Sequence, residues 1–593
     1  MDFYSFYTGF CFDAYKFLGA HYSPVNTVFR TFAPNAAGIN LLYNGREIPM
    51  QRICDGNFYE TTVEKANVGE TYEYRIYHAD GGYTDHCDPY GFQSEMPPQH
   101  KSVICDLGKY SFGDDKWLEN RSVCADMPLN IYEMHLGSWR RKADGGLYSY
   151  SEIAEPLISY LKEAGYNYVE FMPICEYPCD ESWGYQNTGF FAPTSRYGNP
   201  DDLMRLIDNL HQNNIGVILD FVPVHFAVDE FALARYDGGA LYEYPHNAVG
   251  VSEWGSYNFM HSRGEARSFL QSSANYWLSE FHFDGLRMDA VSRIIYWQGD
   301  KNRGVNGNAV DFIKVMNKGL KERNKNCILI AEDSTDYRGV TLPVDMGGLG
   351  FDYKWDMGFM HDTLEYFQTQ PDLRPQHYHK LTFSMMYFGN EKYLLPFSHD
   401  EVVHGKATIL QKMNGQYENK FPQARAMYLY VAVHPGKKLN FMGNEFGQLR
   451  EWDEKREQDW DLRKYPSHDG FFRFMSDLNK IYLSHSALFE RDYYNGGFSW
   501  LDCHRESQCV YAVKRESKSE TLIAVFNFSD KKQEYILPLS NTRAKILINT
   551  DWNIYGGTAE PEAKHLRFAE NGIALDLAPF SGLLIESDRK DEN

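Results

Sequence analysis

The alternation of hydrophobic and polar positions divides the chain into three parts. Residues 1 to about 115 contain short runs of alternating β-forming residues between turn residues, for example at 71–77. The last part, from about 491 onward, repeats this pattern, for example at 522–526. A period of two at this spacing is typical of antiparallel β-sandwiches. We therefore predict an N-terminal β-sandwich over 1–115 and a C-terminal all-β domain over 491–593.

Residues 116–490 follow another pattern, in which short apolar strands alternate with helical segments. One unit begins at Asn199, a common helix-capping residue type, and Pro200 follows where a missing N–H costs nothing. Gly216 is predicted to end this helical unit before the next apolar strand. The apolar stripe of the predicted helix has a period of 3.6 and consists of Leu203, Leu206, Ile207 and Leu210.

Eight apolar runs of this kind are candidate strands of a parallel sheet. They begin near Ile131, Tyr168, Val217, Gly285, Ile328, Phe351, Leu394 and Leu439. Eight strand–helix units within one domain of the α/β class predict a closed (β/α)8 TIM-type barrel with long loop insertions. A doubly wound open sheet is the alternative, but that fold usually carries a Gly-rich phosphate turn after its first strand, and the sequence has none there.

Four of the predicted strands end in acidic residues, with His or Arg beside three of them. The residues concerned are Asp220 and His225 after the third strand, Arg287 and Asp289 on the fourth, Glu332 after the fifth, and His399 and Asp400 after the seventh. A single Asp behind a strand is often only a helix cap. Barrel enzymes, however, take their catalytic groups from the C-terminal ends of strands, so four such ends in one chain favour an active site.

Clustered carboxylates in a barrel mouth suit either a metal ion or glycoside chemistry. Arg287 and Asp289 are two positions apart on a strand and therefore share a face. A guanidinium keeps a neighbouring carboxylate ionised, which suits a nucleophile, and is a poor neighbour for a cation. We therefore expect no metal and no cofactor. In a retaining glycosidic reaction a second carboxyl group, about 5–5.5 Å away, donates and later removes a proton.

These four segments, in this order, resemble the signature regions of the α-amylase superfamily. The resemblance implies that Asp289 is the nucleophile, Glu332 the general acid/base and Asp400 the stabiliser of the transition state. It also implies that a set of further side chains binds the glucosyl unit at the cleavage point. This set comprises Tyr185, Asp220, His225, Arg287 and His399.

Longer stretches resemble bacterial 1,4-α-glucan (glycogen) branching enzymes more specifically. They lie at 183–189, 192–198, 346–351, 399–406 and 441–447. The resemblance implies cleavage of an α-1,4-glucan with retention, through a glycosyl-Asp289 intermediate, and transfer to a 6-hydroxyl to form the α-1,6 branches of glycogen. Residues 1–115 resemble a family-48 carbohydrate-binding module.

One segment departs from the family pattern. The loop at 297–308 is short and differs in composition from the longer, acidic, Gly- and Asn-rich loop of many members. It is expected to lie near the substrate cleft, where acceptor and transferred chain length are selected.

Two other functions remain as alternatives. A hydrolase on the same scaffold, such as an α-glucan hydrolase, a debranching enzyme or a trehalose-releasing enzyme, would share the first chemical steps and differ in its acceptor. A glycan-binding protein with an inert barrel would be expected to lack a catalytic acid, whereas Asp289, Glu332 and Asp400 are all present.

Composition indicates which classes of partner and which cellular compartment to expect. A net charge of −22 disfavours nucleic acid and anionic membrane surfaces, and leaves a neutral glucan as the expected partner. No apolar stretch reaches the length of about 20 residues that spans a bilayer, and the first residues lack a basic signal region. The ten cysteines have no repeated spacing. We therefore expect a cytoplasmic enzyme with reduced thiols that acts as a monomer.

Overall fold

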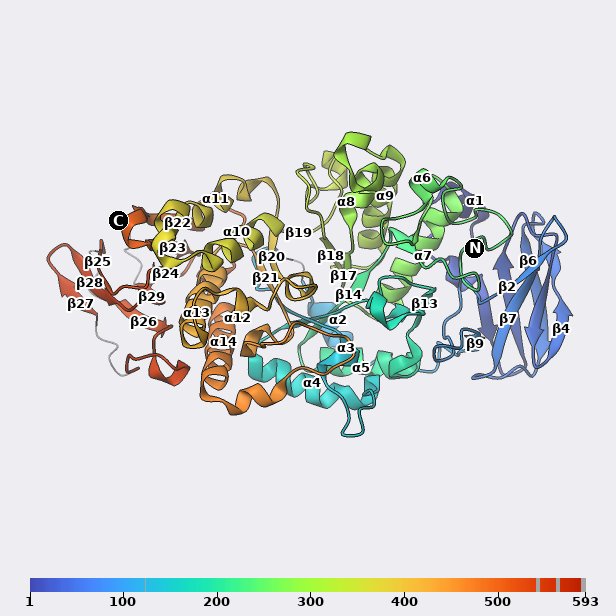
Figure 1. The fold of residues 1–593 in the computed structure, drawn as a ribbon. Helices are drawn as coiled ribbons and strands as arrows, with labels where there is room; N and C mark the ends of the chain where they lie inside the picture. Colours follow the sequence, from blue (N-terminus) through green and yellow to red (C-terminus); the bar gives the residue numbers. More distant parts are fainter. Residues whose placement is uncertain (123, 540–543, 562–565, 588–593) are drawn as a thin grey trace. The chain divides into compact units, whose positions relative to one another are not determined.

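The computed structural model describes residues 1–122, 124–539, 544–561 and 566–587, and Figure 1 shows the order of its elements. The chain divides into two compact units. The first unit comprises Met1–Arg121, His135–Pro156 and Glu170–Asp352. The second unit comprises Ser122–Met134, Leu157–Val169 and Tyr353–Asn593.

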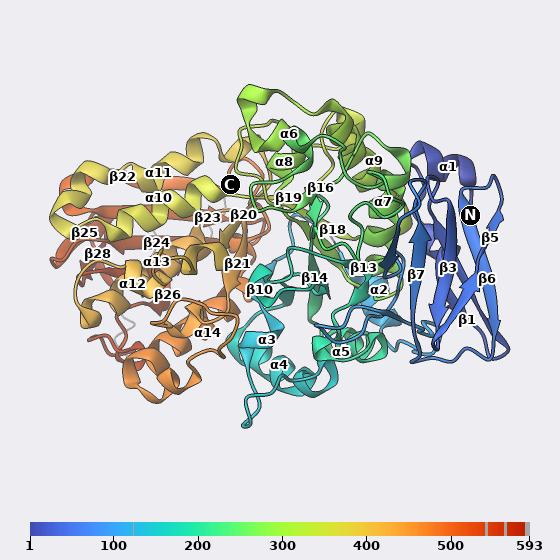
Figure 2. The same cartoon turned by 45° about the vertical axis from the view of Figure 1, so that its right-hand side comes forward.

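The N-terminal part of the first unit consists of two antiparallel sheets, which can be followed in Figure 2. The ring of Phe29 from one sheet lies 4.9 Å from the ring of Tyr72 in the other, edge to face, so aromatic side chains fill the space between them. One sheet has the order β1-β2-β6-β5 and the other β4-β3-β7-β8, with β9 paired to β7. The strands are β1 (Gly19–Tyr22), β2 (Asn26–Phe32), β3 (Gly38–Tyr43), β4 (Arg46–Pro49), β5 (Gln51–Ile53), β6 (Phe58–Glu64), β7 (Thr71–Tyr77), β8 (Tyr83–His86) and β9 (Ser102–Val103).

Backbone hydrogen bonds and side chains fasten these sheets to the barrel part of the same unit. The amide of Cys87 donates to the carbonyl of Phe231 over 2.7 Å, and the hydroxyls of Thr31 and Tyr236 lie 2.6 Å apart. Short helix α1 (Phe3–Thr8) also packs against barrel helix α7 (Gly264–Ser279). The polar contacts are buried, so the sheets and the barrel segments of this unit form one continuous packed body.

Eight parallel strands form a closed barrel in chain order, as the apolar runs predict. Three of the predicted starts agree to the residue, and the others differ by one or two positions. The strands are β10 (Asn130–Met134), β11 (Tyr168–Phe171), β14 (Gly216–Phe221), β17 (Gly285–Met288), β18 (Ile328–Ala331), β19 (Tyr353–Trp355), β20 (Tyr393–Phe397) and β21 (Lys437–Phe441). The open-sheet alternative is thereby excluded. The predicted domain boundaries at 115 and 490 stay predictions.

The longer helices of the barrel part have the amphipathic or fully buried character that a barrel's outer layer requires. Helix α5 begins as predicted, because Asn199 caps the amide of Asp202 and Asp202 returns a bond in a capping box. The prediction for Gly216 is wrong. Asn214, at φ 59°, makes the left-handed turn, and Gly216 is already in β14. The longer helices of the barrel part are α4 (Tyr150–Ala164), α5 (Pro200–Gln212), α7 (Gly264–Ser279), α9 (Gly307–Arg323), α10 (Met357–Gln368), α13 (Tyr417–Val433) and α14 (Pro466–Ser484).

Strand β21 starts two residues before its predicted start. Its first two residues are buried lysines, which an apolar pattern does not mark as part of a strand. Lys437 donates to a carboxylate oxygen of Asp492 over 3.0 Å, and Asp492 also accepts from Arg515 over 2.7 Å. Lys438 instead donates to the carbonyls of His434 and Gly436. Each ammonium is therefore compensated inside the second unit, which makes a charged start of a buried strand tolerable.

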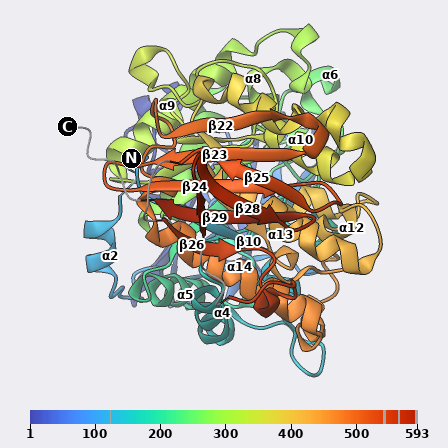
Figure 3. The same cartoon turned by 90° about the vertical axis from the view of Figure 1, so that its left-hand side faces the viewer.

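Two antiparallel sheets form the C-terminal part of the second unit, and Figure 3 shows them face-on. The larger has the order β22-β23-β24-β29-β26 and the smaller β25-β28-β27. This agrees with the prediction of an all-β region. The strands are β22 (Phe498–Arg505), β23 (Val510–Glu516), β24 (Thr521–Asn527), β25 (Gln533–Leu537), β26 (Ala544–Asn549), β27 (Arg567–Ala569), β28 (Gly572–Leu577) and β29 (Ser581–Ser587).

A buried histidine lies between two carboxylates near the N-terminal ends of β14 and β17. The ring of His211 lies 2.7 Å from Asp114 and 3.0 Å from Asp284, and all three side chains are almost completely buried. Burial alone would lower the pKa of His211, but the two carboxylates outweigh it and raise this pKa to about 9. Asp284 also accepts the amide of Val217, which links the starts of β14 and β17.

Replacement of this histidine, His211→Gln, is expected to lower the free energy of unfolding by about 3 kcal/mol, because Asp114 and Asp284 lose the buried counter-charge that they share. The folded-state pKa of His211 lies above the ordinary value of 6.5. Its contribution to stability is therefore complete below pH 6.5 and is lost as the pH rises through about 9.

Urea unfolding at a series of pH values measures this effect. His246→Gln, at an exposed position, is the control and is expected to leave the unfolding midpoint unchanged. A destabilisation by His211→Gln that stays the same from pH 6 to pH 10 would contradict the assignment.

Candidate active site

Three of the predicted site residues in the first unit, all of them acids, gather around the buried guanidinium of Arg287. Asp220 is the register partner of Arg287 in the neighbouring strand, and Nη1 of Arg287 lies 2.7 Å from both of its carboxylate oxygens. The same Nη1 lies 2.9 Å from Oδ1 of Asp289, as the shared strand face predicts. Nη2 of Arg287 lies 3.8 Å from Oε2 of Glu332. One cation therefore contacts three carboxylates.

The charge of this group is fixed by its burial and its partners. Arg287 is 1% exposed, and burial by itself would lower its pKa. The three carboxylates reverse this effect, with Asp220 the largest contributor, and hold the pKa of Arg287 well above its usual value. The guanidinium is thus a permanent positive charge that favours the ionised form of Asp220 and Asp289, the two carboxylates that it contacts within 3 Å.

Backbone hydrogen bonds continue beyond the strand ends and position Asp289 and Glu332. The amide of Asp289 donates to the carbonyl of Phe221, and the amide of Glu332 donates to that of Met288, each over 3.0 Å. Ala290 adopts the left-handed conformation at φ 50°, and its amide donates to Oε2 of Glu332 over 2.6 Å. A non-glycine residue in this conformation is uncommon and often marks a functional turn. Both acidic side chains keep partial exposure, 15% and 18%, so they can reach a ligand.

Tyr185 is brought to the same group by a glycine-dependent turn. Gly184 has φ 92°, and a Cβ atom there would lie 2.2 Å from the carbonyl oxygen of Pro173, so only glycine fits. The hydroxyl of Tyr185 donates to Asp220 over 2.6 Å, and its ring lies 6.0 Å from the guanidinium carbon of Arg287. The phenol ring thereby becomes one wall of the site.

His225 is a buried, neutral imidazole that follows Asp220 by five residues in the sequence. It lies on the short strand β15 (His225–Phe226), which pairs with β16 (Tyr257–Asn258). Burial, assisted by the positive charge of Arg293, lowers the pKa of His225 to about 4. Within the described residues, its Nδ1 atom has no hydrogen-bond partner. A neutral imidazole has one nitrogen that donates and one that accepts, which suits hydrogen bonding to a hydroxyl group.

The second unit holds the remaining predicted residues, His399 and Asp400, at the C-terminal end of β20. The ring of His399 donates to Glu133 over 2.6 Å, and its backbone amide donates to the other oxygen of the same carboxylate over 3.0 Å. Asp400 lies 3.5 Å from the other ring nitrogen of His399, and its side chain is 41% exposed. Glu133 is fully buried, and its hydrogen bond with the ring of His399 fixes which ring nitrogen carries a proton.

Glu133 is the functional residue that the sequence interpretation missed. It stands at the C-terminal end of the first barrel strand, the same kind of position that singled out the acids of the other strands. An acid inside the apolar run 130–134 was the available signal.

The segment after Asp400 is held by a second polar cluster. Lys412 donates to the backbone carbonyls of Glu401 and Ala407. The carboxylate of Glu401 lies 3.3 Å from Lys406 and 3.6 Å from His361. Burial lowers the pKa of Lys412 to about 8. These contacts close the turn that presents Asp400.

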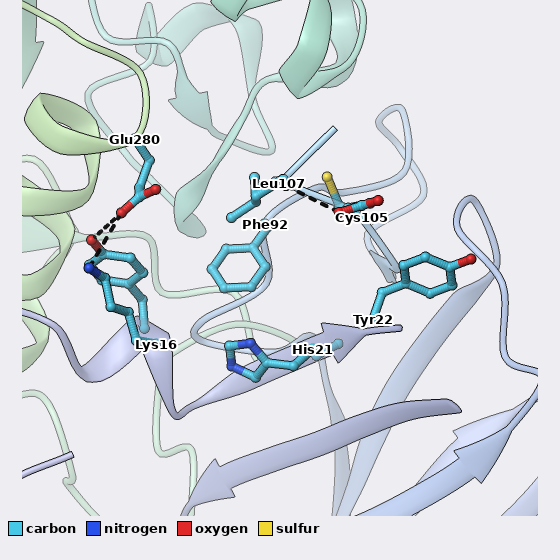
Figure 4. A pocket seen from close by; sticks show the side chains of 11 residues that line it. Lys16, His21, Tyr22, Phe92, Cys105, Leu107 and Glu280 are labelled. Atoms are coloured by element: carbon cyan, nitrogen blue, oxygen red, sulfur yellow. Dashed lines mark hydrogen bonds and ion pairs between the residues drawn. The ribbon is translucent and has the colours of Figure 1, made fainter. Parts of the chain in front are cut away.

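A hollow of about 280 Å³ elsewhere in the first unit contains none of the predicted site residues (Figure 4). It is lined by Tyr15, Lys16, Ala20, His21, Tyr22, Phe92, Cys105, Asp106, Leu107, Gly108 and Glu280. Within the described ranges, no group of three or more His, Cys, Asp or Glu side chains is arranged so that it could hold a metal ion. The helices of these ranges include none with the length and hydropathy of a membrane span.

Comparison with protein families identifies three regions. Residues 2–90 match the N-terminal domain of alpha-1,4-glucan branching enzyme GlgB, residues 152–237 the alpha amylase catalytic domain, and residues 500–588 the alpha amylase C-terminal all-beta domain.

Curated relatives match the chain over almost its whole length. The 1,4-alpha-glucan branching enzyme GlgB of Fusobacterium nucleatum is 42% identical over 99% of this chain and 98% of its own. Its counterpart from Bacillus subtilis is 39% identical over the same shares, and that from Geobacillus stearothermophilus is 40% identical over 100% of this chain and 96% of its own.

Among solved structures, the pullulanase of Anoxybacillus sp. LM18-11 in complex with maltotetraose superposes with a TM-score of 0.76 at 19% identity. It covers 98% of this chain and 89% of its own. The pullulanase of Bacillus acidopullulyticus gives 0.73 at 18% identity, over 96% and 74%. At this identity the likeness concerns the fold alone.

The neutral state of His225 gives a test of the site's electrostatics. We expect its imidazole to stay uncharged from pH 8 down to pH 5, because burial and Arg293 both disfavour the cation. NMR of ¹³C-labelled histidine measures this, and a His225→Asn variant identifies the resonance among the 20 histidines. A titration midpoint near the ordinary value of 6.5 would show that water reaches the ring freely.

Proposed function

Because the chain belongs to the 1,4-α-glucan branching enzymes of the alpha-amylase family, we propose that the acids around Arg287 carry out branching by double displacement. The reaction of the family forms α-1,6 branches on an α-1,4-glucan. The observation that supports this assignment of residues most strongly is the contact of one buried guanidinium with Asp220, Asp289 and Glu332. The roles of the individual residues are our proposal.

In the first step, Asp289 attacks the anomeric carbon of the glucan as Glu332 protonates the glycosidic oxygen. The C1–O4 bond breaks, a C1–carboxylate bond forms on Asp289, and the non-reducing fragment stays on the enzyme as an ester. Arg287 supports this step because its positive charge keeps Asp289 ionised and nucleophilic. The amide of Ala290 donates to Oε2 of Glu332 and so helps to orient this carboxyl group.

In the second step, Glu332 acts as a base. It removes the proton of a glucose 6-hydroxyl on the acceptor chain, and the resulting oxygen attacks C1 from the face that the leaving group vacated. The ester on Asp289 breaks, the carboxylate is regenerated and an α-1,6 linkage forms with net retention. Transfer exceeds hydrolysis when an acceptor chain reaches the intermediate before water does.

The remaining residues are proposed to bind the glucosyl unit at the cleavage point. Tyr185 offers a ring face held by Asp220, and neutral His225 offers a nitrogen for a hydroxyl group. Asp400 is proposed to stabilise the positive charge that develops on the sugar ring. His399, oriented by Glu133, would donate to a hydroxyl group of the same sugar.

Two further proposals concern the setting of the reaction. All ten cysteines lie in the described part of the chain and are free thiols, which supports a reducing compartment and so the cytoplasm. We also propose that the enzyme acts as a monomer, because the six proposed residues of the first unit are supplied by one chain.

A direct assay tests branching against hydrolysis. Linear amylose incubated with the protein is expected to lose its iodine colour with few new reducing ends, because each cleavage is followed by transfer. Treatment with a debranching enzyme is then expected to release many reducing ends. Reducing ends that rise in parallel with the loss of colour, with no further release after debranching, would make the protein a hydrolase.

The substitution Asp289→Asn is expected to lower kcat by about 10⁴-fold or more, because the neutral amide cannot form the glycosyl ester. The same amylose assay measures the loss. Asp311→Asn, in an exposed ion pair with Arg267, is the matched control and is expected to retain full activity. Residual activity above one per cent in Asp289→Asn would exclude this residue as the nucleophile.

A further inference from the structure

Trp254 is a large exposed aromatic side chain beside the proposed sugar pocket. It is 46% exposed, and its ring centroid lies 5.1 Å from that of His225 at an angle of 44°. Solitary exposed apolar residues are common on protein surfaces. This one differs because it adjoins a proposed sugar-binding residue in the same unit.

A tight turn fixes the position of the indole. The hydroxyl of Ser252 accepts the amides of Trp254 and Ser256, each over 3.2 Å, and lies 2.6 Å from the hydroxyl of Ser256. The amide of Ser252 donates to the carbonyl of Ser256 over 2.8 Å. The ring is therefore presented with little conformational freedom left to lose on binding.

Arg293 connects the indole to the strand end that carries Asp289. Its guanidinium lies 4.6 Å from the Trp254 ring centroid, and it forms an ion pair with Glu253. Arg293 lies on α8 (Val291–Ile295), which begins two residues after Asp289. The contacts with Arg293 and His225 orient the ring and leave almost half of its surface exposed.

Two glutamines tie the turn to the rest of the site. Gln186, the residue after Tyr185, donates to the carbonyl of Trp254 over 3.3 Å. Gln298 donates to the carbonyl of Val251 over 2.9 Å, and its own carbonyl accepts from Arg293 over 2.8 Å. Gln298 belongs to the short loop 297–308 that departs from the family pattern. That loop therefore supports Trp254.

We propose that Trp254 is a subsite of its own: its indole stacks against the glucosyl unit adjacent to the one held in the catalytic pocket. The proposal rests on the proposed function, which places a sugar at His225. The flat faces of a pyranose carry C–H groups that pack on an aromatic ring, and the hydroxyls at its rim can meet the polar groups of the turn.

The chemistry of the surroundings favours a neutral sugar over other ligands. Glu253 compensates Arg293, so the turn presents no free positive charge to an anion. One ring framed by polar residues is also far smaller than the apolar patch that a protein partner needs. A glucan chain that already occupies the pocket meets neither difficulty.

Binding to a catalytically inert form tests the subsite without chemistry. In an Asp289→Asn background, Trp254→Ala is expected to raise the Kd for maltoheptaose about tenfold, whereas Trp254→Phe keeps a flat ring and stays within about threefold. Calorimetry measures both values. Tyr494→Ala, which removes an aromatic residue that is 60% exposed, is the control and is expected to change nothing.

Steady-state kinetics in the otherwise native chain completes the test. Trp254→Ala is expected to raise KM for amylose with a smaller change in kcat, and to leave the unfolding midpoint in urea unchanged. A Kd within twofold of the parent overturns the subsite, as does a loss of binding that accompanies a lower unfolding midpoint and is not restored by phenylalanine. Failure of the native protein to branch amylose would refute the proposed function instead, since the binding measurement does not depend on turnover.

Discussion

The arrangement of the first unit depends on one buried ion cluster, the guanidinium of Arg287 among the carboxylates of Asp220, Asp289 and Glu332. To remove an arginine from water costs several kcal/mol unless groups of opposite charge compensate it. Three acids around one cation supply this compensation and leave excess negative charge. The excess is useful, because the reaction proposed here develops positive charge on a sugar ring. Stability and chemistry thus rely on the same contacts.

The cluster requires that neighbouring strands keep their register, and polar contacts secure that register at both ends. At the C-terminal ends, Arg287 bridges β14 and β17 through Asp220. At the N-terminal ends, Asp284 accepts the amide of Val217 and is itself held by His211. In the second unit, Lys437 on β21 is joined through Asp492 to Arg515 on β23. The buried charges of these three clusters therefore lie where strands must not slide.

The sequence pattern predicted the barrel well because hydrophobic runs bounded by turn residues report directly on burial. Arg287 and Asp289 were predicted to share a face from strand geometry alone, and they do. The start of β21 was predicted two residues late because Lys437 and Lys438 look exposed until their partners, far away in the chain or in the backbone, are known. Glu133 was missed for a similar reason, since its partner His399 lies 266 residues away.

Local backbone conformation was the least predictable feature. Gly216 looked like the residue that ends a helix, but Asn214 takes the left-handed conformation. Ala290 takes it as well, although no property of alanine indicates this. The surroundings of these residues in the folded chain, and not their residue type alone, select these conformations.

The amide of Ala290 has a consequence for how far apart the two proposed catalytic carboxylates can lie. Asp289 follows β17 and Glu332 follows β18, and these strands pair with Met288 opposite Ala331. The backbone N–H of Ala290, the residue after Asp289, donates to the carboxylate of Glu332. The separation of the two carboxylates is therefore set by the hydrogen-bond ladder between β17 and β18 rather than by side-chain rotation. A ladder can shift only in whole residues, and each single step turns side chains to the opposite face. Loops around the mouth can therefore vary in length and composition, and with them the chains that are accepted, while the reacting groups keep a constant spacing.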